Sequence, residues 1–195
     1  MKNLFVLLFV LLIGISSNNL FAQDEEAGMD PAMMQAWQES MTPGPMHELL
    51  ANRVGKWTAE VKMWMDPSQP PTTSQATTVC EPMLGGRYFK SVHTGDMMGM
   101  PFEGFEISGY DNVKKEFFTI WMDNMGTGIM VSTGSYDEAS GTFTFTGQMT
   151  EPMGTEMNVR EVIKVIDNDH STFEMYVDMG GQEVKNMEIN YTRVK

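Results

Sequence analysis

Hydrophobic and polar residues alternate along most of the chain from residue 56 onward. Between residues 141 and 150, Phe143, Phe145 and Met149 alternate with threonines, and Phe173 and Met175 follow the same rule further on. A period of two is typical of a β-strand with one buried face. The pattern, interrupted by turn residues, predicts ten strands, at 56–65, 74–81, 86–94, 101–110, 115–123, 127–136, 141–150, 155–166, 171–178 and 183–194.

These strands predict an all-β fold. No long helical pattern separates them, which excludes a doubly wound parallel sheet. Ten strands joined in sequence by short turns predict one antiparallel up-and-down β-barrel, because closure removes exposed strand edges. A short helical turn is expected at 46–54, ended by Gly55.

The connections between the strands predict which end of the barrel is open. In a meander, alternate connections fall at the same end. One set is compact, at 82–85, 111–114, 137–140 and 167–170. The other set, at 66–73, 95–100, 124–126, 151–154 and 179–182, is richer in glycine, proline and methionine. We therefore predict a closed end of tight turns and a mouth fringed with methionine.

The N-terminus has the pattern of a secretory signal peptide. Lys2 is followed by an apolar run from Leu4 to Ile15, and Ala22 precedes polar residues. The run is shorter than the ~20 apolar residues that span a bilayer. We expect cleavage after residue 22, export to the bacterial periplasm or the exterior, a flexible acidic leader at 23–45 and the barrel domain at 46–195.

The charge of the chain limits the kinds of partner it can bind, and its cysteine content excludes an internal disulfide. Removal of Lys2 would leave 12 basic and 26 acidic residues, a net charge of −14. Strong negative charge argues against nucleic acid and anionic membrane surfaces, which attract basic patches, and no later stretch is long enough for stable membrane insertion. Cys80 is the single cysteine, so no internal disulfide forms, and we expect it to be a buried small side chain.

Several short motifs carry a resemblance to known families. Gly55-Lys56-Trp57 after a helical turn is similar to the opening of the calycin and lipocalin barrels, in which a tryptophan plugs the closed end. More of the chain, from about His47 to Val194, resembles the bacterial DUF1579 family, a domain of unknown function. That resemblance rests on the motifs His47-Glu48-Leu49-Leu50, Gly85-Gly86-Arg87-Tyr88, Pro101-Phe102-Glu103-Gly104, Gly109-Tyr110-Asp111 and Trp121-Met122-Asp123. It implies a calycin-like barrel and no particular chemistry.

The leading hypothesis is a non-enzymatic protein that binds a small apolar molecule in the barrel. We expect an interior lined by Phe143, Phe145, Phe173, Met175, Met187, Ile189 and Tyr191. Arg87, His93 and Trp121 are the candidate orienting groups, and Glu103 and Asp123 are candidate polar groups beside His93 and Trp121 at the mouth. Arg87 would pair either with an anionic ligand group or, structurally, with Glu103 or Glu161.

Three alternatives remain open. His93 with Met97, Met98 and Met100 would suit Cu(I), since thioethers are soft ligands, and His93 with methionine would also suit haem. His93 with Asp123 would suit acid–base catalysis, although no nucleophile elbow, P-loop or His-Glu-x-x-His motif occurs. The third alternative is a structural barrel filled by its own side chains. The chain has three histidines, and His47 and His170 are expected away from His93, so a three-histidine zinc site cannot form. Cofactor, protein partners and oligomeric state are not indicated.

Barrel closure is a testable consequence of the pattern. Trp57 opens the first predicted strand and Arg193 nearly ends the last, and both have inward parity. If these strands pair antiparallel, the guanidinium should lie within about 6 Å of the indole ring. Coordinates with the two residues far apart would indicate a two-sheet sandwich instead.

Overall fold

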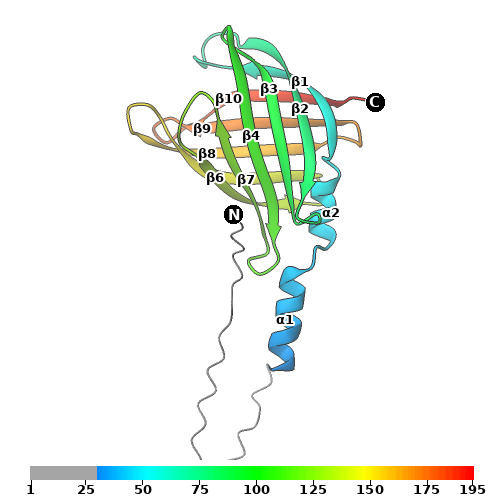
Figure 1. Ribbon diagram of the computed structural model, residues 1–195. Coiled ribbons are helices and arrows are strands. Elements are labelled where there is room, and N and C mark those ends of the chain that lie inside the picture. Colours follow the sequence, from blue (N-terminus) through cyan, green and yellow to red (C-terminus); the bar gives the residue numbers. More distant parts are fainter. Residues whose placement is uncertain (1–29) are drawn as a thin grey trace, which may run out of the picture.

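The computed structural model describes residues 30–195. The predicted signal peptide and the first residues of the leader lie outside the described range. Two helices, α1 (Pro31–Met41) and α2 (Pro45–Ala51), precede ten strands (Figure 1). The strands are β1 Gly55–Met63, β2 Thr72–Met83, β3 Tyr88–Met97, β4 Met100–Asp111, β5 Glu116–Asp123, β6 Met130–Asp137, β7 Thr142–Thr150, β8 Glu156–Val165, β9 His170–Asp178 and β10 Glu183–Arg193.

The ten strands form one closed antiparallel barrel. Each strand pairs with its neighbours in sequence, and β10 closes the barrel on β1. The closing register places Trp57 opposite Arg193, Ala59 opposite Tyr191 and Val61 opposite Ile189. The predicted fold class is confirmed, and every predicted strand overlaps an observed one.

One connection at the mouth is tighter than the sequence suggests. The stretch 95–100 was expected to be a loop, but β3 continues to Met97 and β4 begins at Met100. Only Met98 and Gly99 form the turn, both with positive φ, 55° and 82°. Two successive positive φ values are typical of a type I′ hairpin turn, whose twist matches that of the flanking strands. Met98 therefore adopts a conformation that non-glycine residues rarely take.

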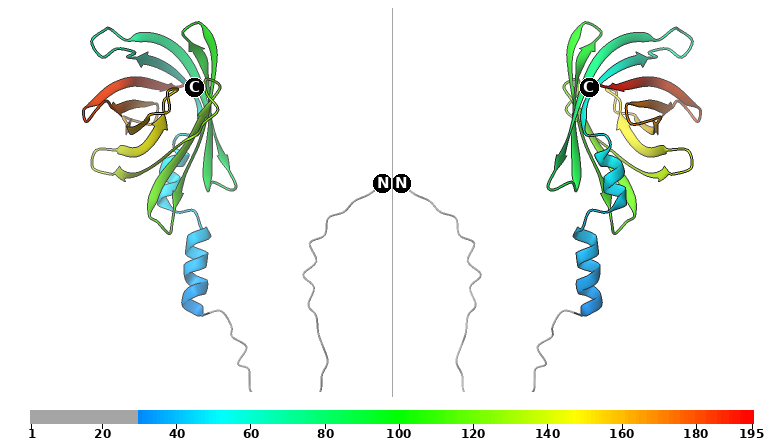
Figure 2. Two further views of the ribbon diagram at one scale, coloured as in Figure 1. Left: turned by 90° about the vertical axis from the view of Figure 1, so that its left-hand side faces the viewer. Right: turned by 90° about the vertical axis from the view of Figure 1, so that its right-hand side faces the viewer.

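The segment before the barrel contains the helix α1, where the sequence predicts a flexible acidic leader. Asp30 accepts a hydrogen bond from the Ala32 amide and caps its N-terminus. None of its residues is buried, and it projects away from the barrel (Figures 1 and 2). The Asn112 side chain of the β4–β5 turn donates to the carbonyls of Glu39 and Thr42, which ties the end of α1 to the barrel. Between residues 30 and 195 no helix is both long and apolar enough to cross a membrane.

The hydrophobic core lies toward the end of the barrel that carries α2 and the compact turns. Leu50 of α2 packs against side chains from the barrel wall, which form the buried cluster Cys80, Phe89, Phe117, Phe143 and Phe145. Phe117 and Phe143 meet edge to face at 5.1 Å between centroids, and Phe143 and Phe145 stack at 6.3 Å. Such offset contacts are the favoured geometry of aromatic pairs. Helix α2 and these rings together plug this end of the barrel.

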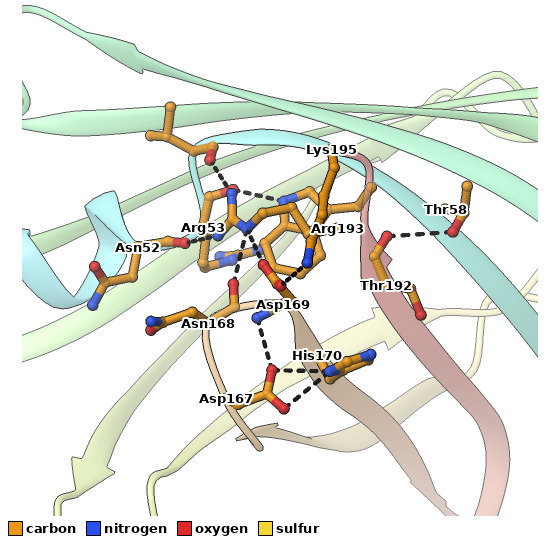
Figure 3. A network of polar contacts seen from close by, with 12 residues as sticks. Asn52, Arg53, Thr58, Asp167, Asn168, Asp169, His170, Thr192, Arg193 and Lys195 are labelled. Carbon is orange, nitrogen blue, oxygen red and sulfur yellow. Dashed lines mark hydrogen bonds and ion pairs between the residues drawn. The ribbon is translucent and has the colours of Figure 1, made fainter.

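Arg193 joins three segments of chain at the same end (Figure 3). Its guanidinium lies over the Trp57 ring, 4.1 Å from the centroid, which confirms the predicted contact. It donates to the carbonyls of Asn52 at 2.6 Å and Val54 at 2.7 Å, which follow α2, and to that of Asn168 at 2.8 Å in the β8–β9 turn. The Trp57 indole donates to the carbonyl of Arg53 at 2.9 Å. A cation at the end of a helix is also electrostatically favourable.

We predict that Arg193→Ala lowers the free energy of unfolding by ~3 kcal/mol, because it removes the cation–π contact and leaves carbonyls without their charged donor. Trp57→Ala should cost ~3–5 kcal/mol through the cavity it leaves, and the double variant should be clearly less than additive. Urea unfolding measures all three.

Arg160→Ala is the matched control. Arg160 lies over the Tyr176 ring at the same 4.1 Å and pairs with Glu183, but on the outer wall of the barrel. Exposed pairs contribute ~0–1 kcal/mol, so its loss should be small. If Arg193→Ala and Arg160→Ala lower the free energy of unfolding equally, the contacts of Arg193 with Trp57 and the three carbonyls are not the main stabilising interaction at this end of the barrel.

Candidate ligand cavity

A cavity of about 590 Å³ occupies the barrel interior beside the core. It extends from the mouth, where Met63 and Asp96 line it, to the α2 end, where Asn52 and Asn168 line it. Its walls are mainly apolar, and a volume of this size is typical of small-molecule sites. The principal apolar lining residues are Trp57, Ala59, Val61, Met63, Phe102, Trp121, Phe143, Ile163, Phe173, Met175, Met187 and Ile189.

Strand parity builds these walls. In β1 the side chains of Ala59, Val61 and Met63 line the cavity, and their register partners in β10 do the same. Because successive residues of a strand point to opposite faces, the apolar residues of an alternating strand all point into the barrel. Six of the seven residues predicted to line the interior line the cavity, with Phe145 as the exception: Phe143, Phe173, Met175, Met187, Ile189 and Tyr191.

An aromatic wall stands on one side of the mouth. Gly104 of β4 pairs with His93 of β3 and with Asp123 of β5, so the three form one row across the sheet. The Trp121 ring occupies the space above Gly104, where an added Cβ would lie only 2.4 Å from the ring. There the ring contacts His93 at 5.2 Å between centroids and stacks on Phe102 at 6.3 Å. Its indole donates to Asp123 at 2.8 Å. The structure thus brings together the predicted residues His93, Trp121 and Asp123.

A buried polar cluster lies deeper in the cavity and consists of Arg53, His93, Glu106, Glu161 and Tyr191. Arg53 enters from the connection between α2 and β1 and pairs with Glu106 at 2.9 Å. Glu106 is close enough to His93, Glu161 and Tyr191 to influence the pKa of each. Burial alone would raise the pKa of Glu106, but the charge of Arg53 lowers it overall, so Glu106 is ionised.

His93 and Glu161 are each only 8% exposed. Burial lowers the pKa of His93 to about 4, so its ring is neutral at pH 7. Its Nδ1 contacts the Thr78 hydroxyl at 2.9 Å, whereas its Nε2 is buried without a hydrogen-bond partner among the described residues. Burial, reinforced by the charge of Glu106, raises the pKa of Glu161 to about 7. Unpaired buried polar groups are costly and therefore point to a function.

Three predicted ligand residues lie elsewhere. Arg87 belongs to the β2–β3 turn at the α2 end, where its guanidinium donates to the Leu84 carbonyl at 3.0 Å. Glu103 is exposed, because the inward row of β4 runs through Phe102 and Glu106 instead. Phe145 does point inward but is buried within the hydrophobic core rather than lining the cavity. Arg87, Glu103 and Phe145, which the sequence offered as ligand-binding residues, therefore do not line the cavity.

The proposed copper ligands are not gathered around one point. Met97 follows His93 by four residues in β3, which separates them by about 13 Å along the strand. Met97 and Met98 line the outer rim, and the Met98 side chain is 69% exposed. Met100 is also exposed at the start of β4. Within the described part of the chain, no cluster of three or more His, Cys, Asp or Glu side chains is arranged to hold a metal ion.

Three central residues, Arg53, Glu106 and Glu161, were not among the predicted site residues, and Glu161 was named only as a structural partner for Arg87. Glu106 has the same parity as Phe102, and Glu161 has the same parity as Val159 and Ile163. A charged residue within an inward row is the signal that could have identified both acids. Arg53 precedes the first strand, so no strand parity applies to it.

Comparison with known proteins identifies a family and a fold. The family described as "Protein of unknown function (DUF1579)" matches residues 42–193. The solved structure of Rv2717c from M. tuberculosis is similar, with a TM-score of 0.60 and 11% identity over 79% of this chain and all of that chain. At this identity the likeness concerns the fold alone. No curated protein matches the chain in sequence.

The raised pKa of Glu161 predicts a pH-dependent stability. Between pH 4.5 and about pH 7 the folded state retains a proton that the unfolded state has lost, so stability falls as the pH rises through this range. Replacing Glu161 with glutamine removes this loss. Relative to the wild type, Glu161→Gln should therefore gain about 3 kcal/mol in free energy of unfolding between pH 4.5 and pH 8.

Urea unfolding at both pH values checks this prediction. His93, whose pKa is lowered, contributes the opposite trend, but equally in both proteins, so the difference reports Glu161. Glu156→Gln, an exposed position of the same strand, is the control and should show no such gain. A stability difference that stays constant with pH would contradict a buried, largely protonated Glu161.

Proposed function

The chain belongs to the DUF1579 family, whose function is unknown, and we propose that it binds a small, largely apolar molecule inside the barrel. The observation that carries this proposal is the interior itself. A barrel of this size can fill its centre with side chains, yet this one leaves about 590 Å³ beside its hydrophobic core. The proposed role is binding rather than catalysis.

The arrangement of the walls supports such a ligand. Apolar side chains of β1, β9 and β10 offer a broad surface for burial, worth roughly 25 cal/mol for each Å² of apolar area removed from water. Trp121 and Phe102 add flat aromatic surfaces near the mouth. The few polar groups converge deep inside, where they would orient one end of a bound molecule. This combination of a largely apolar wall and a few polar groups is typical of ligand sites.

A neutral apolar dye such as Nile red should bind the folded protein at one saturable site. Met175→Trp would project a larger side chain into the cavity and should weaken binding at least tenfold. Val131→Trp is the control, because Val131 is half exposed and does not line the cavity. Fluorescence titration measures both. Absence of saturable binding, or equal weakening by the two substitutions, would reject the proposal.

We also propose that binding takes place outside the cytoplasm, since the N-terminal pattern is that of a signal peptide. Expressed with its own N-terminus in a bacterium, the protein should be recovered from the periplasm or the medium with Gln23 as its first residue. Intact mass spectrometry measures this directly. Recovery of the full-length chain from the cytoplasm would contradict it.

A further inference from the structure

We propose that the ligand carries a protonated amine on its apolar body and that Glu161 binds this amine within the cavity. This inference rests on the proposed binding function and adds the chemical class of the ligand. It is carried by the charges that line the cavity and by the position of one of them.

The titratable groups of the cavity wall are strongly unbalanced in charge. Within the described range 30–195, Arg53 is the one lysine or arginine that lines it, whereas five carboxylates do so, namely Asp96, Glu106, Asp123, Glu161 and Asp167. Arg53 is already paired with Glu106 at 2.9 Å. An anionic ligand would therefore find no free cation and several acids, and a cationic ligand would find the reverse.

Four of the five carboxylates are already engaged. Glu106 pairs with Arg53. The three aspartates accept backbone N–H groups of nearby turns, those of Gly99, Met125 and Asp169 respectively, at 2.7, 2.9 and 2.7 Å. Among residues 30–195, no backbone N–H donates to Glu161 and no basic side chain forms a salt bridge with it, although the Ser132 hydroxyl is near enough to donate a hydrogen bond.

The neighbours of Glu161 leave this carboxylate open to a ligand. It lies in the middle of β8 and is 8% exposed, with Phe145 of β7 and Met175 of β9 opposite it in the register. Both partners are uncharged, so the adjacent strands supply no counter-ion. The charged and titratable groups that face it across the interior are Arg53, Glu106, His93 and Tyr191. Two of these are neutral at pH 7, and the other two pair with each other.

The surroundings also suit an organic cation. An ammonium group near Glu161 would gain a charge-assisted hydrogen bond in a site from which water is largely excluded. The rings of Phe143 and Phe173, which line the same cavity, present faces that attract a cation. The apolar remainder of the ligand would extend along Val61, Met187 and Ile189 toward the mouth.

The ionisation of Glu161 predicts how binding changes with pH. In the empty protein its pKa is about 7, so below that value the carboxyl must lose a proton before it can pair with an amine. An alkylamine stays protonated throughout this range. Amine binding should therefore be about tenfold weaker at pH 6 than at pH 8, whereas binding of an uncharged analogue should not change.

Titration with octylamine, octanol and octanoate by calorimetry tests the proposal on the exported protein. At pH 8 we expect octylamine to bind at least tenfold more tightly than the other two. Glu161→Gln should lower octylamine affinity to that of octanol without changing octanol affinity. Glu156→Gln, at an exposed position of the same strand, should leave all three affinities unchanged.

The outcomes distinguish a failure of the amine proposal from a failure of the proposed binding function. If octanol or octanoate binds as tightly as octylamine, or if the preference for octylamine survives Glu161→Gln, the amine proposal is overturned while the binding function stands. If none of the three binds and Nile red does not bind either, both are overturned. The pH dependence in the wild-type protein provides a test that requires no substitution.

Discussion

The contact between Arg193 and Trp57 is the interaction on which the rest of the architecture depends. It lies where the last strand meets the first, so it closes the barrel. The same guanidinium binds carbonyls after α2 and in the β8–β9 turn, and thereby holds the plug in the end of the barrel (Figure 3). Gly55 leaves room for it, since an added Cβ would lie 2.9 Å from Nη1. A planar group with five donors can serve several acceptors at once, which a lysine cannot do.

Closure of the barrel allows its interior to contain both a packed core and an open cavity. The rings of Phe89, Phe117 and Phe143 gather near α2 and supply a compact core, while the walls of β1, β9 and β10 face open space. Since closed strands have no unpaired edges, the barrel does not need a solid centre to satisfy its backbone. The stability of the plugged half supports the cavity beside it.

The buried polar cluster reduces this stability. A glutamate that is protonated near neutral pH and an imidazole nitrogen without a partner are features that a purely structural interior would avoid. Local violations of packing and pairing rules tend to occur at functional sites. The unpaired groups and the empty space lie together, so a bound molecule would compensate for both at once.

The sequence by itself determined the ten strands, the closed barrel and the rows of β1 and β10 that line it, because from Trp57 to Met63 and from Met187 to Tyr191 the apolar residues occupy one parity only. The sequence did not decide which side of β4 points into the barrel, because Phe102 and Phe105 have opposite parities and each side of the strand therefore carries apolar side chains. Glu103 therefore looked as suitable as Glu106. The polar cluster was decided by tertiary structure alone, because Arg53 reaches it from outside any strand and Glu106 and Glu161 approach each other only across the closed barrel. Alternation is a local property that a sequence carries, whereas charge pairing across an interior depends on distances that exist only after closure.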